Sequence, residues 1–324
     1  MARKLSEKEL MAAAAAEHGI VIRKTNVWKR VLQYKYMYLL FLPLLAFYVI
    51  FCYAPMYGVI LAFKSYDYAG GILGSPWIGM DNFRQLFEHP EFATAFANTI
   101  IISFGRLIFE FPIPIILALF INEIRGSGYK RVMQTIYTFP HFLSWVIVYG
   151  LCFNLFSHDG IFNQLMNIMG LKSTQLLQDP KTFRAFLFIS DNWKEMGYGT
   201  IIYLAAITGI SPELYEAGKI DGANRWQLMH YITWPSIKPT VAIMLVLSVA
   251  GMMNAGFDQI FNMDNAAVRG VSDIIDTLVF RLTFVLGADF GFTTAIGLFK
   301  SVINLILMLV ANKVVKNLTG KGIY

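Results

Sequence analysis

The sequence predicts an all-α integral membrane protein with six transmembrane helices. Of its 324 residues, 56% are hydrophobic and only 15% are charged, and the mean hydropathy is +0.52. A water-soluble domain carries about a quarter charged residues, so this chain has too few water-facing side chains to be one. The apolar residues fall into blocks of roughly 20 residues or more, the length of helix that crosses a bilayer.

These blocks define the spans and the organisation of the chain. A polar N-terminal tail, residues 1–36, holds a short helix that starts at Ser6 with Glu9 three residues on. The first apolar block is too long for a signal-peptide core and lacks a cleavage site, so it is expected to remain as a membrane anchor. The membrane domain is predicted over 37–316, with a C-terminal tail over 317–324. The six predicted spans are 37–63, 96–122, 132–156, 183–210, 237–262 and 292–315.

Lysine and arginine residues determine the orientation, because the cytoplasmic flanks of membrane helices carry an excess of them. Of the 27 in the chain, 17 lie in the two tails and around the second and fourth connections, seven lie in the other connections, and three lie within spans. Both termini are therefore predicted to be cytoplasmic. The net charge of +6 follows from this topology and gives no reason to expect a nucleic-acid partner.

The fourth connection, residues 211–236, begins like a short helix and not like an ordinary loop. Ser211 is a good N-cap, and Pro212 follows it at the first helical position. A helix is therefore expected from Pro212 to about Ile220.

A tight turn and a second helix follow in the same connection. Asp221 and Gly222 are a turn signal, since glycine accepts backbone angles that other residues resist. An amphipathic helix is expected over 223–231, ending before Trp234 and Pro235. Two short helices on the positively charged side of the membrane would form a compact hairpin suited to docking into a soluble partner.

This hairpin resembles the EAA loop of binding-protein-dependent ABC importer permeases. In that family the loop contains the coupling helix, which sits in a groove of the cytoplasmic ATPase, so the resemblance implies that Glu216 contacts the ATPase and that Gly222 permits the turn. The loop is named for the pattern Glu-Ala-Ala, and residues 216–218 here read Glu-Ala-Gly, so Gly218 replaces the second alanine. Trp234 replaces the leucine that is usual before the proline. Both replacements are at packing positions. The residues expected to couple to the ATPase are Glu216, Ala217, Asp221, Gly222, Ala223 and Pro235.

The likeness covers about residues 37–316. Trp193 and Lys194 are similar to the fourth-span signature of the carbohydrate branch, and the segments 272–281 and 291–297 are similar to that branch too. These segments are similar to those of permeases for complex oligosaccharides, including the alginate type.

The resemblance implies a complex of several chains in a bacterial inner membrane. It would contain a second homologous permease with the same type I importer fold, two ATPase subunits that bind ATP and Mg, and a periplasmic solute-binding protein that delivers the sugar. The chain itself has no phosphate-binding loop, since the nearest candidate, 170–174, lacks the glycine before Lys172. No catalytic group, resident cofactor or metal site is expected in it.

Polar residues within the spans are candidates for the substrate path, because ionisable groups in a bilayer usually face protein or water. Asn254, Asp258 and Asn262 are spaced four apart, which predicts a polar stripe on the fifth span that faces either sugar hydroxyls or the partner permease. Arg106 and Glu110 are also four apart and can pair, as a structural pair or on the path. The candidate path residues are Asn192, Trp193, Lys194, Asn254, Asp258 and Gln259.

Two other classes of protein remain open at this point. An ion-coupled secondary sugar transporter would use Asp191, Glu195 or Asp258 as its proton site and would need no ATPase. A membrane enzyme acting on lipid-linked sugars would use an intramembrane acid as a base, and the isolated chain would then turn over substrate.

Overall fold

The computed structural model describes residues 32–287 and 289–319. The chain divides into two compact units, Met1–Gly58 and Val59–Tyr324, which are described separately. The short helix expected at Ser6, and most of the two predicted tails, lie outside the described residues. The all-α class is confirmed, because the described segments form helices joined by turns.

The described part of the first unit is a single apolar helical run. It begins at Lys35 and continues past the end of the unit, so that Lys35–Phe63 is long and apolar enough to cross a membrane. No residue of its first three segments is buried, as expected for a helix that has lipid or another chain around it. Its segments are α3 (Lys35–Phe47), the π-helical η1 (Tyr48–Tyr53), α4 (Ala54–Met56) and the 3₁₀ turn η2 (Tyr57–Phe63).

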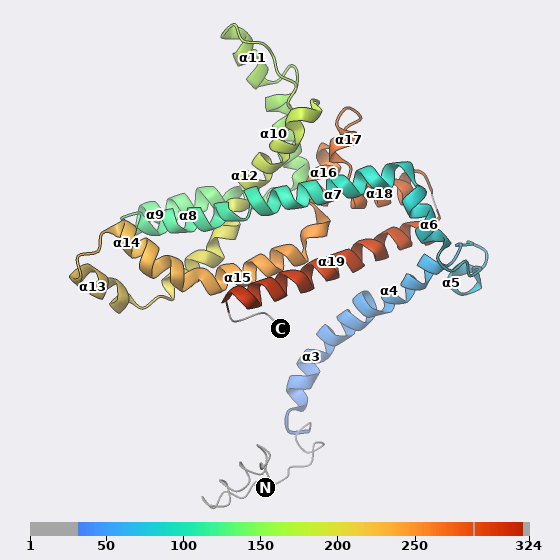
Figure 1. Cartoon of the computed structure of the whole chain (residues 1–324), viewed down its shortest axis with the longest axis horizontal. Coiled ribbons are helices and arrows are strands. Elements are labelled where there is room, and N and C mark those ends of the chain that lie inside the picture. The colour runs from blue at the N-terminus through green and yellow to red at the C-terminus, as the bar shows by residue number, and fades with distance from the viewer. Residues whose placement is uncertain (1–31, 288, 320–324) are drawn as a thin grey trace, which may run out of the picture. The chain divides into compact units, whose positions relative to one another are not determined.

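The second unit contains the remaining helices, and several of them run side by side (Figure 1). They are α5 (Gly71–Gly74), α6 (Asp81–Glu88), α7 (Pro90–Phe109), α8 (Pro112–Glu123), α9 (Ser127–Thr138), η3 (Phe139–Phe142), α10 (Trp145–Phe156), α11 (Ile161–Ile168), α12 (Pro180–Thr208), α13 (Pro212–Ile220), α14 (Arg225–Leu228), η4 (Met229–Thr233), α15 (Trp234–Ala250), η5 (Met252–Asn254), α16 (Phe257–Met263), α17 (Arg269–Ser272), α18 (Ile275–Phe280), η6 (Arg281–Val285) and α19 (Phe290–Thr319).

Among the described residues, five helical runs are long and apolar enough to cross a membrane. The helix α12 has 29 residues and coincides with the predicted fourth span. It is not one of the five, and it carries Asp191, Lys194 and Glu195 in its middle. The sixth transmembrane helix therefore stays a prediction. The five runs are Lys35–Phe63, Pro90–Glu123, Trp145–Ile168, Arg225–Ala250 and Phe290–Asn317.

The third predicted span, 132–156, is wrong as a continuous helix. Its helix breaks after Pro140, where Leu143 and Ser144 adopt extended backbone angles. The Ser144 Oγ accepts a hydrogen bond from the Ile147 N–H (3.4 Å) and so caps a new helix, α10. The apolar run consequently starts later than predicted and includes α11.

The fifth predicted span, 237–262, is also displaced. The helix does not end before Pro235, as expected, but runs from α14 through the π turn η4 into α15. Pro235 therefore lies inside this continuous run, directly after the π turn η4, where the regular α-helical hydrogen-bond pattern is already interrupted. At the far end the helix stops, since Ala255 (φ 47°) and Gly256 (φ 77°) both adopt left-handed backbone angles before α16 begins.

Three apolar clusters hold the second unit together. One joins α7, α10, α12 and α16, the second joins α6, α7, α18 and α19, and the third joins α8, α12 and α15. The long helix α12 belongs to two of them, with Phe183 and Leu187 in the first and Tyr203 and Leu204 in the third. The helix α13 lies at one end of this unit, whereas α17 lies away from that end, next to α7 and α12 (Figure 1).

Candidate functional site

The hairpin predicted in the fourth connection is present. The Ser211 Oγ accepts a hydrogen bond from the Glu213 N–H (3.3 Å) at the start of α13. Gly222 has a φ of +80°, a left-handed angle that favours glycine and makes the turn. A capping box between Asn224 and Gln227 then starts α14, with hydrogen bonds of 2.8 and 2.9 Å.

The two arms of the hairpin touch at Gly218. A Cβ at this position would lie 2.7 Å from Leu228 Cδ2 and 3.1 Å from Ile232 Cδ1. The Tyr215 hydroxyl is also hydrogen-bonded to the Thr233 Oγ1 (2.9 Å), which joins α13 to η4. Glycine in place of the expected alanine therefore matches the close approach of the two helices.

The outer face of α13 is exposed. Glu216, Ala217 and Asp221 are exposed, and neither carboxylate forms an ion pair with the residues that the structure describes. Leu214 and Ile220 on the same helix are 51% and 86% exposed. An exposed acid among exposed apolar side chains is a composition suited to protein–protein contact.

A polar cluster lies between α7, α12 and α16, within the predicted membrane region. Arg106 pairs with Glu110 (3.3 Å), as the spacing predicts, and also with Asp191 on α12 (3.0 Å). Its guanidinium donates a further hydrogen bond to the Gln259 side chain on α16. Gln259 is fully buried, and its amide donates to the Leu187 carbonyl and the Ser190 Oγ (both 2.9 Å).

We call Arg106, Glu110, Asp191 and Gln259 the polar wall, because they lie between two pockets. Arg106, Glu110 and Asp191 line the carboxylate pocket, of about 340 Å³, and Gln259 lines the aromatic pocket, of about 560 Å³. Gly256 borders both, and a Cβ there would collide with the Arg106 guanidinium. The left-handed Gly256 is thus required both by the turn and by the wall.

The six candidate path residues do not share one surface. Asn192 lines the carboxylate pocket, while Asn254, Asp258 and Gln259 line the aromatic pocket. Trp193 lines neither and is 43% exposed. The aromatic pocket also contains a set of residues that sequence reasoning missed, namely Trp145, Phe257, Asp276, Phe280 and Phe284.

Lys194 is buried in a network and does not face either pocket. Its Nζ donates to the His141 carbonyl (3.0 Å) and to the Glu195 carboxylate (2.6 Å), and lies 5.4 Å from the centre of the Trp145 ring. The His141 Nδ1 is 2.6 Å from the other Glu195 oxygen, and its ring stacks on Tyr198 at 3.9 Å. His141 directly follows Pro140, where the helix breaks, and its partners on α12 are residues more than 50 positions away in the sequence.

The predicted stripe of Asn254, Asp258 and Asn262 is wrong. The left-handed residues before α16 interrupt the helix, so Asn254 lies in a different element from the other two. Asn254 accepts a hydrogen bond from the Lys300 Nζ (3.0 Å), which also binds both oxygens of Asp276 (2.6 Å). Asp258 forms no ion pair with the described residues and lines the aromatic pocket.

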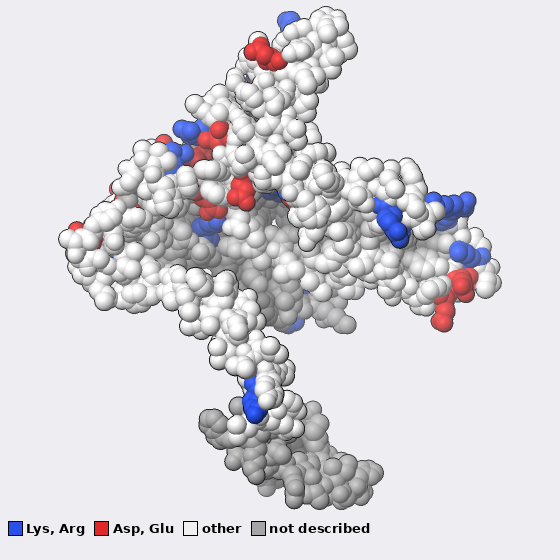
Figure 2. Space-filling view, turned by 180° about the vertical axis from the view of Figure 1, so that it is seen from behind, with Lys and Arg blue, Asp and Glu red and all other residues white. Residues whose placement is uncertain are grey.

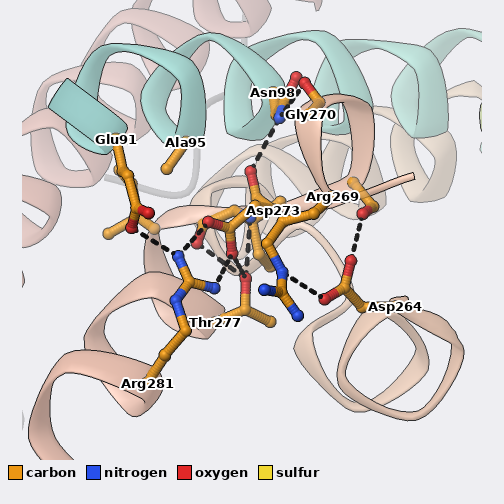
Figure 3. Close-up of polar contacts among 12 residues, drawn as sticks. Glu91, Ala95, Asn98, Asp264, Arg269, Gly270, Asp273, Thr277 and Arg281 are labelled. Atoms are coloured by element: carbon orange, nitrogen blue, oxygen red, sulfur yellow. Dashed lines mark hydrogen bonds and ion pairs between the residues drawn. The ribbon is translucent and has the colours of Figure 1, made fainter. Parts of the chain in front are cut away.

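Away from the hairpin, the buried Asp273 connects three segments (Figure 3). Its carboxylate accepts from Arg281 (2.7 Å) and from the Thr277 Oγ1 (2.7 Å), and its carbonyl accepts from Asn98 on α7 (3.0 Å). Arg281 also bonds to Glu91 (2.8 Å). The hydrogen bond to Asp273, helped by the one to Glu91, raises the pKa of the Arg281 guanidinium above its usual value. Burial acts in the opposite direction but has the smaller effect.

Removing the charge of Arg281 should therefore destabilise the second unit where α7, α18 and η6 meet. In Arg281→Ala, Asp273, whose side chain is 5% exposed, loses its ion pair, and breaking one side of a buried pair costs about 3–5 kcal/mol. Arg84→Ala is the control, since the Arg84 and Asp81 side chains are 77% and 56% exposed and such pairs contribute less than about 1 kcal/mol. Denaturant unfolding in mild detergent measures both, and equal losses would contradict the prediction.

Comparison with known proteins adds independent findings. The model of the family "Binding-protein-dependent transport system inner membrane component" matches residues 110–320. The polygalacturonan/rhamnogalacturonan transport system permease protein YteP of Bacillus subtilis (strain 168) is 38% identical over 98% of this chain and 100% of its own length.

Solved structures are similar over nearly the whole chain. A chain of a bacterial ABC transporter involved in the import of the acidic polysaccharide alginate is 38% identical, with a TM-score of 0.83, covering 90% of this chain and 99% of that one. A chain from the bacterial alginate ABC transporter in complex with an alginate pentasaccharide-bound periplasmic protein is 37% identical, with a TM-score of 0.84, covering 92% and 100%.

Proposed function

The chain belongs to the family of binding-protein-dependent transport system inner membrane components, and from this premise we propose that it carries an oligosaccharide from a periplasmic binding protein into the cytoplasm. It is a permease subunit of an ABC importer and not itself an enzyme. The family assignment therefore excludes the two other classes, an ion-coupled sugar transporter and a membrane enzyme that acts on lipid-linked sugars.

The hairpin of α13 and α14 is the observation that supports the coupling part of this proposal. Its turn at Gly222 and its contact at Gly218 fix the shape of a knob, while Glu216 is exposed and forms no ion pair within residues 32–287 and 289–319. We assign the docking of an ATPase subunit to Glu216, Ala217, Asp221, Gly222 and Ala223, with Pro235 starting the helix that returns to the membrane. Two ATPase subunits then bind ATP and Mg, and a second permease supplies the other half of the path.

The aromatic pocket and the carboxylate pocket are the proposed substrate path. Aromatic rings beside amide and carboxylate groups match the apolar faces and the hydroxyls of a sugar, and the aromatic pocket offers Trp145, Phe280, Asn254 and Asp258. Alternating access then requires the polar wall to open. The names of the relatives support an oligosaccharide, and fragments of alginate type are the first substrate to test.

The proposed orientation puts the hairpin in the cytoplasm and α17 and α18 on the periplasmic side. It is supported by the excess of Lys and Arg in the predicted inner connections. It is also supported by the position of α17, which lies away from the end of the second unit that carries α13 (Figure 1). Both termini are then cytoplasmic.

Affinity purification from mild detergent tests this function. The tagged chain is expected to recover a second permease and an ATPase, and the recovered complex should hydrolyse ATP faster when binding protein loaded with alginate-type fragments is added. Neutral oligosaccharides of equal length serve as the comparison for substrate charge. A chain that purifies alone and transports sugar under an ion gradient would overturn the proposal.

A further inference from the structure

A groove that shares no lining residue with the two pockets of the substrate path lies between α9 and α12 on the surface of the second unit. It has a volume of about 560 Å³, and most of its lining is apolar or threonine. Ile121 on α8 is part of its lining, while Phe139, Phe142 and Ile201 are 61%, 73% and 48% exposed. The groove therefore opens outward, toward whatever surrounds the unit, and not into the interior.

The groove has the length of one bilayer leaflet. At one end, Gly197 lets α12 approach the backbone of α9 so closely that a Cβ at Gly197 would collide with the Tyr137 carbonyl. The other end of the groove is at Thr208. Eleven residues of helix separate Gly197 from Thr208, about 16 Å at 1.5 Å per residue. One leaflet contributes half of a hydrocarbon core of about 30 Å, or about 15 Å.

The lining of the groove suits a hydrocarbon chain. It is apolar or threonine apart from Gln134 and carries no charged side chain among the described residues. A flexible acyl chain can follow such a surface along its whole length, because it needs no matching set of side chains to pack against it.

Basic residues lie at the end of the groove that the Lys and Arg distribution places in the cytoplasm. Lys130 and Arg131 each lie four residues before a lining residue of α9, Gln134 and Thr135, and so on the same helix face. Neither forms an ion pair with another described residue. Figure 2 shows Lys and Arg side chains on the end of the unit where α9 and α13 lie.

We propose that this groove binds one acyl chain of an anionic phospholipid of the inner leaflet, with Lys130 and Arg131 at its headgroup phosphate. The inference rests on the orientation proposed above and goes beyond the transport function. Basic residues beside a crevice between membrane helices on the cytoplasmic side are the usual setting for acidic headgroups, and each basic residue near the surface contributes about fivefold to binding. An acyl chain here would fill the space next to α12, the helix that also carries Asp191 of the polar wall.

Native mass spectrometry of the purified complex in nanodiscs of phosphatidylglycerol and phosphatidylcholine tests the site. Lys130→Gln combined with Arg131→Gln is expected to weaken retention of phosphatidylglycerol roughly 25-fold without changing phosphatidylcholine. Ala205→Trp, which fills the groove, is expected to remove both lipids. Lys313→Gln, which removes an exposed positive charge on α19, is the control and should leave retention as in the unchanged chain.

Two results would overturn the proposal. One is unchanged phosphatidylglycerol retention in both the charge variant and the groove variant. The other is loss of the second permease from the complex on Ala205→Trp, since a protein partner would then occupy the groove. If the chain purifies without an ATPase, the transport proposal fails, but lipid retention is still measured on the purified chain and decides this inference separately.

Discussion

Glu216→Ala is expected to lower transport and binding-protein-stimulated ATP hydrolysis roughly 10- to 100-fold. Glu216 is exposed on α13 and pairs with no cation in the described part of the chain, so its loss should leave the fold intact. A hydrogen bond to a charged group contributes about 1.5–3 kcal/mol, and in this proposal the lost bond is one made to the ATPase. Vesicle uptake and ATPase assays on the same preparation measure the two quantities together.

Gly222→Val should uncouple the complex for a different reason. A Cβ at Gly222 would meet nothing within 4 Å, but the φ of +80° is strained for a β-branched residue, at a cost of about 1–3 kcal/mol. The turn would relax and the hairpin would lose its shape without any clash elsewhere. The variant is therefore expected to insert normally and to lose the ATPase.

Glu213→Ala is the matched control for the hairpin. Glu213 is also an exposed acid on α13, but it lies in the first turn, outside the coupling residues. Its loss should change transport less than about twofold, since it removes only a favourable charge at a helix start, about 0.3–1 kcal/mol of helix stability. Equal losses of transport in Glu213→Ala and Glu216→Ala would show that the total charge of α13 matters. The contact assigned to Glu216 would then be wrong.

The membrane helices could be predicted from the sequence where apolar content and length decide the matter. The runs around 37–63, 96–122 and 292–315 were found for this reason, and so was the hairpin, whose caps and glycine are local signals. The breaks within the third and fifth predicted spans were missed. Pro140 and the pair Ala255 and Gly256 are weak local signals, and apolar residues continue on both sides of them.

The pairings of the candidate site could not be predicted, because they join residues far apart in the chain. The pair of Arg106 and Glu110 follows from helical spacing, whereas Asp191 and Gln259 reach Arg106 only through the packing of α7 against α12 and α16. The predicted stripe failed for a related reason. A period of four residues predicts a common face only on an unbroken helix, and left-handed residues follow Asn254.

Arg106→Ala is expected to prevent the chain from accumulating in the membrane. It would leave Glu110 and Asp191, whose side chains are 15% and 13% exposed, without their cation, and Gln259 without its donor. Removing one partner of a buried ion pair costs about 3–5 kcal/mol, a large part of the 5–15 kcal/mol that a folded protein commonly has. The amount of chain in the membrane fraction, and its unfolding in detergent, measure the effect.

A combined variant separates the structural role of the polar wall from its role in transport. Replacing Arg106, Glu110 and Asp191 all by leucine removes the three charges together, which is often neutral or stabilising for a buried cluster, so the chain should accumulate again. Transport should stay more than tenfold below normal, because the wall then offers no polar groups to a sugar passing between the two pockets. Arg106→Lys, which keeps the charge but not the planar fork that reaches three acceptors, should fall between the two. Normal transport by the leucine variant would mean that the cluster only holds α7, α12 and α16 together, and the path would have to run elsewhere.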